Sequence, residues 1–200
     1  MLLAAVPDCV AVLSTMPSTQ VNLRELQAPI KARYQSDPTA AKITLRVKSS
    51  ASDLADPLHC AIMPEAAPDV TWQSGAHPGV GGVGDVPCSG DLLLGALAAC
   101  QEVTIRMVAA AMGIELEALE VEAIGDLDLR GTLGMDREVP VGFSAIRCQT
   151  RVTIKDDGRP ERAKRLLENA ERYCVVLNTL RGGVPVESRF ALQSSTPVSS

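Results

Sequence analysis

Residues 88–114, CSGDLLLGALAACQEVTIRMVAAAMGI, decide the fold of this chain. Ser89 is a good N-cap, Asp91 lies in the first turn, where the helix dipole favours a negative charge, and Gly113 is suited to ending a helix. The segment predicts a helix over about residues 90–112, roughly 35 Å long at about 1.5 Å per residue. Because apolar residues occupy more than one face, we expect the helix to be buried on several sides. Its main apolar face consists of Leu93, Leu97, Cys100, Thr104, Met107 and Ala111.

Segments with the alternating pattern of half-buried strands lie on both sides of this helix. Residues 41–48 and 58–63 precede it, and residues 120–130, 145–155 and 184–192 follow it. The outward side chains are mainly acidic in the first strand after the helix and mainly basic in the second, which favours these two strands as neighbours. The order of strands and helices is typical of an α+β fold with mostly antiparallel pairing.

Two further helices and a long loop complete the pattern. Residues 22–35 are weakly helical, and a second helix begins at Pro160, a preferred first-turn residue, and ends at residues 181–183. Residues 64–89 are rich in Pro and Gly and predict a loop. The alternation changes phase at residues 124–125, where we expect a β-bulge. The apolar stripe of the second helix consists of Ala163, Leu167, Ala170, Cys174 and Leu177.

The composition is that of one compact domain. The chain has 200 residues, of which 46% are hydrophobic, so it can bury a core. We expect a single domain over residues 21–192, between a flexible extension at 1–20 and a flexible tail at 193–200. The N-terminal apolar stretch has no basic residue before it, unlike a secretory signal, which favours a cytoplasmic protein with reduced thiols.

Charge and aromatic content argue against two classes of partner. The formal net charge is −5 and Lys and Arg form no run, so we expect neither nucleic acid nor an anionic membrane as a partner. One Trp, two Tyr and two Phe are too few to build a stacking platform for single strands. No apolar run approaches the roughly 20 residues that span a bilayer.

The chain has six cysteines but no metal-binding spacing. It has no CxxC, and the adjacent His59 and Cys60 would point to opposite faces of a strand, so we expect no metal and no cofactor. Cys100 and Cys174 lie on apolar stripes, where a thiol usually packs as a small hydrophobe. A redox role requires a thiolate, and a pKa near 8.5 leaves only about 3% of a thiol ionised at pH 7. Cys174 faces the same core as Cys100 and can approach it. Cys148, on the inward face of its strand, could approach as well, although a core role is commoner for such a residue.

Two motifs resemble the OsmC/Ohr family, the osmotically inducible protein C and organic hydroperoxide resistance proteins. They are residues 88–114 and residues 172–180, RYCVVLNTL, which Gly-Val-Pro-Val follows at 183–186. The resemblance covers roughly residues 40–192. It implies an OsmC-like fold, with antiparallel curved sheets around long central helices in an intertwined homodimer whose active sites lie at the subunit interface.

The resemblance also implies a two-Cys thiol-dependent peroxidase. Cys100 would be the peroxidatic nucleophile and Cys174 the resolving thiol. Organic hydroperoxides are the implied substrates, and a dithiol, such as a lipoylated protein, is the implied reductant.

The sequence departs from the family pattern at three places. Gly90 stands where hydroperoxide-resistance members have the Glu that orients an activating Arg, although Asp91 matches members with the acid one position later. Val175 replaces the Pro that often follows the second Cys. The family takes its activating Arg from the early strand region, where Arg46 is the nearest candidate.

Other assignments remain open from the sequence. Arg33 and Arg106 are weaker candidates for the activating group. A non-catalytic OsmC-like protein that holds a small apolar ligand at the dimer interface is the alternative function, and the departures favour it. Sulfur or acyl transfer through Cys100 would need the same thiolate and is not separable from peroxide reduction by sequence.

Overall fold

The computed structural model describes residues 22–50, 52–155 and 159–192, so the extension expected at 1–20 and the tail expected at 193–200 lie outside the described residues. The elements, in chain order, are α1 (Leu23–Ser36), η1 (Pro38–Ala41), β1 (Val47–Lys48), β2 (His59–Pro64), β3 (Trp72–Gly75), η2 (Pro78–Val80), α2 (Ser89–Met112), β4 (Leu116–Leu127), α3 (Leu129–Thr132), β5 (Phe143–Ile154), α4 (Pro160–Tyr173) and α5 (Val175–Gly182). The expected α+β fold is confirmed. It contains a three-stranded sheet, β1–β2–β3, and a two-stranded sheet, β4–β5, both antiparallel.

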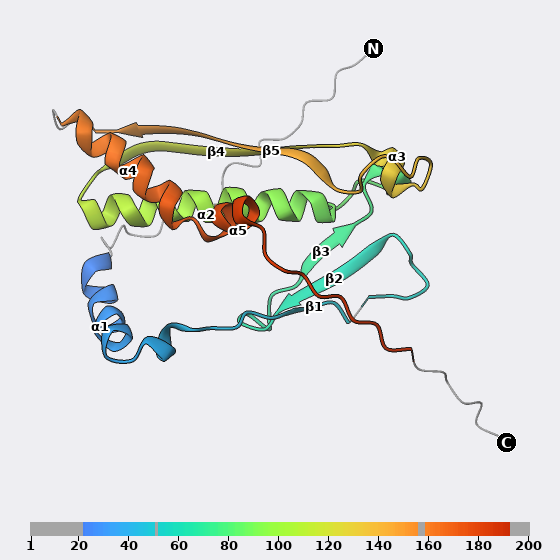
Figure 1. The fold of residues 1–200 in the computed structure, drawn as a ribbon, viewed down its shortest axis with the longest axis horizontal. Helices are drawn as coiled ribbons and strands as arrows, with labels where there is room; N and C mark the ends of the chain where they lie inside the picture. The colour runs from blue at the N-terminus through green and yellow to red at the C-terminus, as the bar shows by residue number, and fades with distance from the viewer. Residues whose placement is uncertain (1–21, 51, 156–158, 193–200) are drawn as a thin grey trace, which may run out of the picture.

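Helix α2 is the centre of the fold. It lies along the β4–β5 ribbon and contacts β4, α4 and α5 (Figure 1). Its N-cap is Cys88 rather than the expected Ser89, and the Cys88 backbone N–H donates to Oδ2 of Asp91 at 2.9 Å. The helix ends at Gly113, whose φ of 66° is a left-handed conformation that favours glycine.

The predicted apolar face of α2 shares only Leu97 with the buried residues of this helix. Its buried side chains are Leu97, Gln101, Ile105 and Ala109. Leu93 and Met107, from the predicted face, are 39% and 40% exposed. Because α2 is apolar on most of its faces, its own periodicity does not select one, and the selection comes from packing against Leu166 and Ala170 of α4.

Strands β4 and β5 pair as the charge pattern predicts. Glu120 lies opposite Arg151 in the register, and the Glu120 carboxylate accepts a hydrogen bond from Nη1 of Arg151 at 2.8 Å. Asp126 likewise pairs with Arg147 across the two strands. These pairs lie on the exposed face, so they fix the register of the ribbon rather than add much to stability.

The expected bulge at residues 124–125 is wrong. Both residues pair regularly with β5, and the irregularities fall at Leu116/Ala118 and Asp126/Leu127 instead. The change of phase has another cause, which is space for a ring: a Cβ atom on Gly125 would lie 2.4 Å from the ring of Phe143. The glycine therefore makes room for an aromatic side chain within a regular strand.

Three strand predictions need correction. Only Val47–Lys48 of the strand expected over 41–48 is a strand, residues 184–192 form none, and β3 lies inside the expected loop. Ile43 and Leu45 are 75% and 78% exposed, and Val186 is 86% exposed. Alternation predicts a strand only where a neighbouring strand pairs with it and a surface covers its apolar side, and the described chain supplies neither at these positions. The short β3 pairs with β2 through its backbone between Pro- and Gly-rich flanks, so it carries little pattern of its own.

The helix expected from Pro160 to residue 181 is broken at Cys174. The Cys174 N–H donates to the Ala170 carbonyl oxygen and closes α4, while the Cys174 carbonyl oxygen accepts the N–H of Asn178 and opens α5. The Asn178 side-chain amide donates to the carbonyl oxygens of Glu171, Arg172 and Cys174 at 3.1, 3.2 and 2.8 Å. One side chain thus donates to two carbonyl groups, those of Glu171 and Arg172, in the last turn of α4, where a helix leaves its carbonyl groups without partners.

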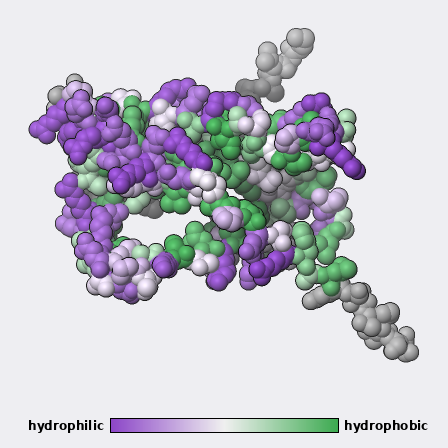
Figure 2. Space-filling view, viewed as in Figure 1, coloured by the Kyte–Doolittle hydropathy of each residue, from purple (hydrophilic) through white to green (hydrophobic). Residues whose placement is uncertain are grey.

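One face of α2 is uncovered in the described chain. By length and composition α2 is apolar enough to cross a membrane, because Glu102 and Arg106 are the charged residues within its long apolar stretch. Core helices of globular proteins pass the same criterion. Val103 is 51% exposed. Figure 2 shows an opening through the molecule between the layer that contains α2 and the arm formed by α1, η1 and β1, with hydrophobic residues on part of its rim.

Candidate functional site

The thiols of Cys100 and Cys174 meet between α2 and the junction of α4 with α5. Cys100 lies in the middle of α2 and is half-buried, whereas Cys174 is 0% exposed. The two side chains share a hydrogen bond. The sequence-based expectation that Cys174 can approach Cys100 is therefore met by the structure.

The surroundings of Cys100 favour its thiolate. Burial alone would raise the pKa of this thiol, but the backbone N–H of Val176, the Cys174 thiol and the backbone N–H of Val175 donate to the sulfur and hold the pKa below its ordinary value. Thr104 is the weakest of the groups that act in this direction, and its single hydroxyl hydrogen is already donated to the Cys100 carbonyl oxygen at 2.7 Å. The backbone amides and Cys174 therefore stabilise the anion.

These amides are the first N–H groups of α5. Cys174 is the N-cap of α5, so Val175 and Val176 occupy its first turn and their N–H groups have no partner within the helix. The positive end of the helix dipole adds to the stabilisation of an anion at this place. A proline at position 175 would have no N–H to donate, so the valine found there supplies one of the hydrogen bonds.

The environment of Cys174 acts in the opposite direction. Burial has the largest effect and raises the pKa of Cys174. The hydrogen bond from the Leu177 N–H lowers this pKa. The hydrogen bond that Cys174 donates to Cys100, and the nearby charges of Cys100 and Cys148, raise it further. Two adjacent thiols with different pKa values can take different roles in a reaction. The thiol with the lower pKa is suited to attack as a thiolate, and the thiol with the higher pKa keeps its proton until a proton acceptor forms beside it.

Asp91 and Arg46 lie away from this pair. Asp91 caps the first turn of α2, and hydrogen bonds from Cys88 lower the pKa of its carboxyl group. Arg46 is exposed and forms an ion pair with Glu65 at 3.6 Å. Neither side chain is among the groups that shift the pKa of Cys100 in the described part of the chain.

The remaining cysteines differ in their surroundings. Cys60 on β2 and Cys88 at the start of α2 are half-buried, and Cys9 lies outside the described residues. Cys148 lies on the inward row of β5 and lines a cavity of about 550 Å³ with Gln101, Leu177 and Arg181. Sequence reasoning gave this thiol a core role and gave Gln101 none.

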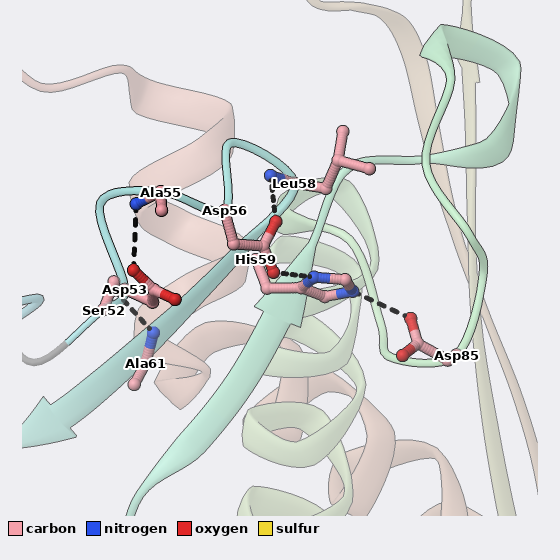
Figure 3. A network of polar contacts seen from close by, with 8 residues as sticks. All are labelled: Ser52, Asp53, Ala55, Asp56, Leu58, His59, Ala61 and Asp85. Carbon is pink, nitrogen blue, oxygen red and sulfur yellow. Dashed lines mark hydrogen bonds and ion pairs between the residues drawn. The ribbon is translucent and has the colours of Figure 1, made fainter.

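A second polar cluster joins the β1–β3 sheet to the start of α2. Nδ1 of His59 lies 2.7 Å from Oδ2 of Asp56, in the turn before β2, and Nε2 lies 3.0 Å from Oδ1 of Asp85, in the loop before α2 (Figure 3). Only the protonated ring can donate to both carboxylates. The hydrogen bonds with Asp56 and then with Asp85 raise the pKa of His59.

We expect His59→Gln to destabilise the protein more at about pH 6 than at about pH 9. The folded-state pKa of His59 lies above its unfolded value, so the stabilisation is fully present below an unfolded pKa of about 6.5 and is lost as the pH rises through the higher folded-state pKa. Urea midpoints of both proteins across this range measure the effect. Asp85→Asn serves as the matched control because it removes one of the two carboxylates. A constant difference between wild type and His59→Gln at all pH values would contradict the prediction.

The described residues contain no group of three or more His, Cys, Asp or Glu side chains that could hold a metal ion. The chemistry that the site offers is that of its thiols. A buried pair with one sulfur favoured as an anion can attack an electrophilic atom and then form a disulfide bond.

Comparisons with known proteins identify the family and the fold. The family described as OsmC-like protein matches residues 82–189, and a search of curated proteins finds no match. Among solved structures, an OsmC-like protein from Mycoplasma pneumoniae superposes with a TM-score of 0.55 at 17% identity, covering 71% of this chain and 90% of that one. An OsmC-like protein of unknown function from Vibrio cholerae has a TM-score of 0.55 at 12% identity, covering 69% and 94%. An organic hydroperoxide resistance protein from Legionella pneumophila has a TM-score of 0.51 at 20% identity, covering 70% and 90%.

These likenesses define the class of the fold, which is that of the OsmC-like structures. The family match spans more than half of the sequence and includes both Cys100 and Cys174. The chain therefore belongs to the OsmC-like family, as the two motifs predicted.

Proposed function

We propose that this protein is a thiol-dependent peroxidase that reduces organic hydroperoxides with Cys100 and Cys174. The observation that carries the proposal is the contact, at the first turn of α5, between two thiols whose pKa values are shifted in opposite directions. The name of the neighbour from Legionella pneumophila, an organic hydroperoxide resistance protein, supports the same substrate class.

The reaction balances with these two sulfur atoms and one hydroperoxide. The Cys100 thiolate attacks the terminal oxygen of the hydroperoxide, the O–O bond breaks, and the alkoxide leaves as an alcohol after taking a proton. Cys100 is then a sulfenic acid. Cys174 loses its proton and attacks the Cys100 sulfur, so that a disulfide forms and water leaves. A dithiol, such as the lipoyl group of a partner protein, restores both thiols.

The proposal gives the activation of Cys100 to backbone amides. The N–H groups of Val175 and Val176 take the place of the guanidinium that the family resemblance implies. Arg46, the nearest candidate for that guanidinium, forms an ion pair with Glu65 instead. Asp91 contributes indirectly, because it caps the helix that carries Cys100. Backbone donors at a helix N-terminus are sufficient in kind for this task, since they lower the pKa of cysteines in other proteins.

A second copy of the chain completes the fold in this proposal. Val184, Val186, Phe190 and Leu192 alternate along an exposed extended segment and have exposed fractions of 57% to 97%. Ile43 and Leu45 show the same alternation before β1. Such segments have the pattern of strands without a partner in their own chain, as the homodimer implied by the family resemblance requires.

The test is a single turnover with one equivalent of cumene hydroperoxide. We expect two thiols to be lost per equivalent, one equivalent of cumyl alcohol to appear, and a Cys100–Cys174 disulfide to be found by peptide mapping of a sample quenched early with acid. The alternative function, a protein that only holds an apolar ligand, would leave the hydroperoxide and all thiols unchanged. That result would overturn the proposal.

A further inference from the structure

We propose that Cys148 is a third redox-active thiol, which receives the disulfide from Cys100 and presents it to the reductant in the cavity beside β5. This inference rests on the proposed function for the origin of the disulfide. It differs from a two-Cys cycle because Cys100 becomes a free thiolate again before any reductant binds.

The position of Cys148 carries the first step of the argument. It lies on the inward row of β5, opposite Ala123 of β4, and faces the helices. The cavity that it lines is also lined by Gln101, the neighbour of Cys100 on α2, and by Leu177, three residues after Cys174. Cys148 is close enough to Cys174 for the charge on one sulfur to raise the pKa of the other. Cys174 thus has one thiol neighbour on α2 and another on β5, and we call Cys100, Cys174 and Cys148 the row of thiols.

The accessibility of the sulfur atoms gives the second step. Cys174 is 0% exposed, so a reductant cannot attack it directly in the folded protein. Cys148 is half-buried and open to a cavity of about 550 Å³, which is large enough for a small dithiol or the end of a lipoyl arm. A disulfide that contains Cys148 therefore has a sulfur atom which a reductant can reach.

An unpartnered polar atom points to a ligand in the same cavity. Gln101 lines the cavity and is only 8% exposed, yet its Oε1 has no hydrogen-bond partner among the described residues. A buried acceptor without a donor costs free energy until a donor arrives. Arg181, paired with Glu171, adds a cation to the wall. An entering dithiol with an amide or thiol hydrogen could satisfy Gln101 as it approaches Cys148.

The exchange balances without an added oxidant. Cys148 loses its proton to water in the cavity, where the charge of Arg181 partly offsets the effect of burial on its pKa. Its sulfur attacks Cys174, the Cys100–Cys174 bond breaks, and the electron pair leaves on Cys100 as a thiolate. Thiol–disulfide exchange favours the leaving group of lower pKa, and Cys100 is that group. One sulfur of the dithiol then attacks Cys148 and releases Cys174, which takes a proton. The second sulfur of the dithiol attacks the first, so that the dithiol closes into its own disulfide and Cys148 leaves as a thiol.

Peptide mapping of the wild-type protein tests the inference directly. After one equivalent of cumene hydroperoxide, we expect a Cys100–Cys174 disulfide at early times and a Cys148–Cys174 disulfide later, with Cys100 again open to alkylation by iodoacetamide. In Cys148→Ser the disulfide should stay at Cys100 and Cys174, and Cys100 should stay blocked. We also expect dithiol-dependent turnover of this variant to fall about tenfold, since neither sulfur of the remaining Cys100–Cys174 disulfide lines the cavity beside β5. Cys60→Ser, which alters a thiol outside the row, is the matched control.

A separate oxidant distinguishes failure of the inference from failure of the proposed function. Diamide forms disulfides between thiols without any peroxide, so its products map the row even if the protein does not consume hydroperoxide. If the protein consumes hydroperoxide but no Cys148–Cys174 disulfide forms with cumene hydroperoxide or with diamide, the inference is wrong and the proposed peroxidase function stands. Because this readout uses the wild-type chain, it does not depend on whether Cys148→Ser folds.

Discussion

Cys100→Ser is expected to lose peroxidase activity by at least about a thousandfold, because a hydroxyl group is not ionised at neutral pH and forms no sulfenic acid. The hydrogen bonds from the first turn of α5 stabilise a thiolate and cannot make an oxygen nucleophile of comparable strength. Stopped-flow measurement of cumene hydroperoxide consumption, with dithiothreitol as the reductant, gives the rates of both proteins.

The matched control for this variant is Cys60→Ser. Cys60 is also half-buried, but it lies on β2 and has no part in the row of thiols. We expect it to retain activity within about twofold of wild type. If Cys100→Ser consumed hydroperoxide as fast as Cys60→Ser, the nucleophile would have to be another group, and the assignment of Cys100 would be wrong.

Leu166→Ala is expected to lower the free energy of unfolding by about 2–5 kcal/mol, which is the usual cost of leaving a cavity in a packed core. Leu166 of α4 is 0% exposed and packs with Ile105 and Ala109 of α2. The substitution removes the largest side chain that α4 contributes to this cluster. Urea unfolding followed by circular dichroism measures the change.

The next residue provides the control. Leu167 has the same side chain in the same helix but is 43% exposed, so Leu167→Ala should cost less than about 1 kcal/mol. Equal losses for the two variants would mean that the α2–α4 contact is not the core of the fold. The sequence-based stripe included Leu167 and omitted Leu166, so this pair of variants also decides between the predicted and the observed faces of α4.

The elements with strong local signals could be predicted from the sequence. The limits of α2 follow from Asp91 and Gly113 at its ends, although the N-cap is Cys88 and not the expected Ser89, and the pairing of β4 with β5 follows from Glu120 and Arg151. The faces of the helices could not be predicted as well. In α2 nearly every face is apolar, so the face that contains Gln101 and Ile105 is selected by the positions of the elements packed against it, β4, α4 and α5.

The candidate site could be predicted only in part, because an apolar pattern places residues in a core without showing where a helix breaks. Two thiols on apolar stripes were expected to meet in one core, and they do. The break at Cys174 could not be expected, because Val175, Val176 and Leu177 continue the apolar pattern through it. At the break the Asn178 amide donates to three carbonyl oxygens, and the first turn of α5 faces Cys100.

The use of main-chain donors at Cys100 has a consequence for mutagenesis. An alanine scan replaces side chains and keeps every peptide N–H, so it would pass over Val175 and Val176 and report that nothing activates the nucleophile. A proline substitution at position 175 would reveal one of these donors, because proline has no backbone N–H. A comparison of side chains among relatives also misses backbone donors. A member of this family without the expected arginine should therefore not be judged inactive on that ground alone.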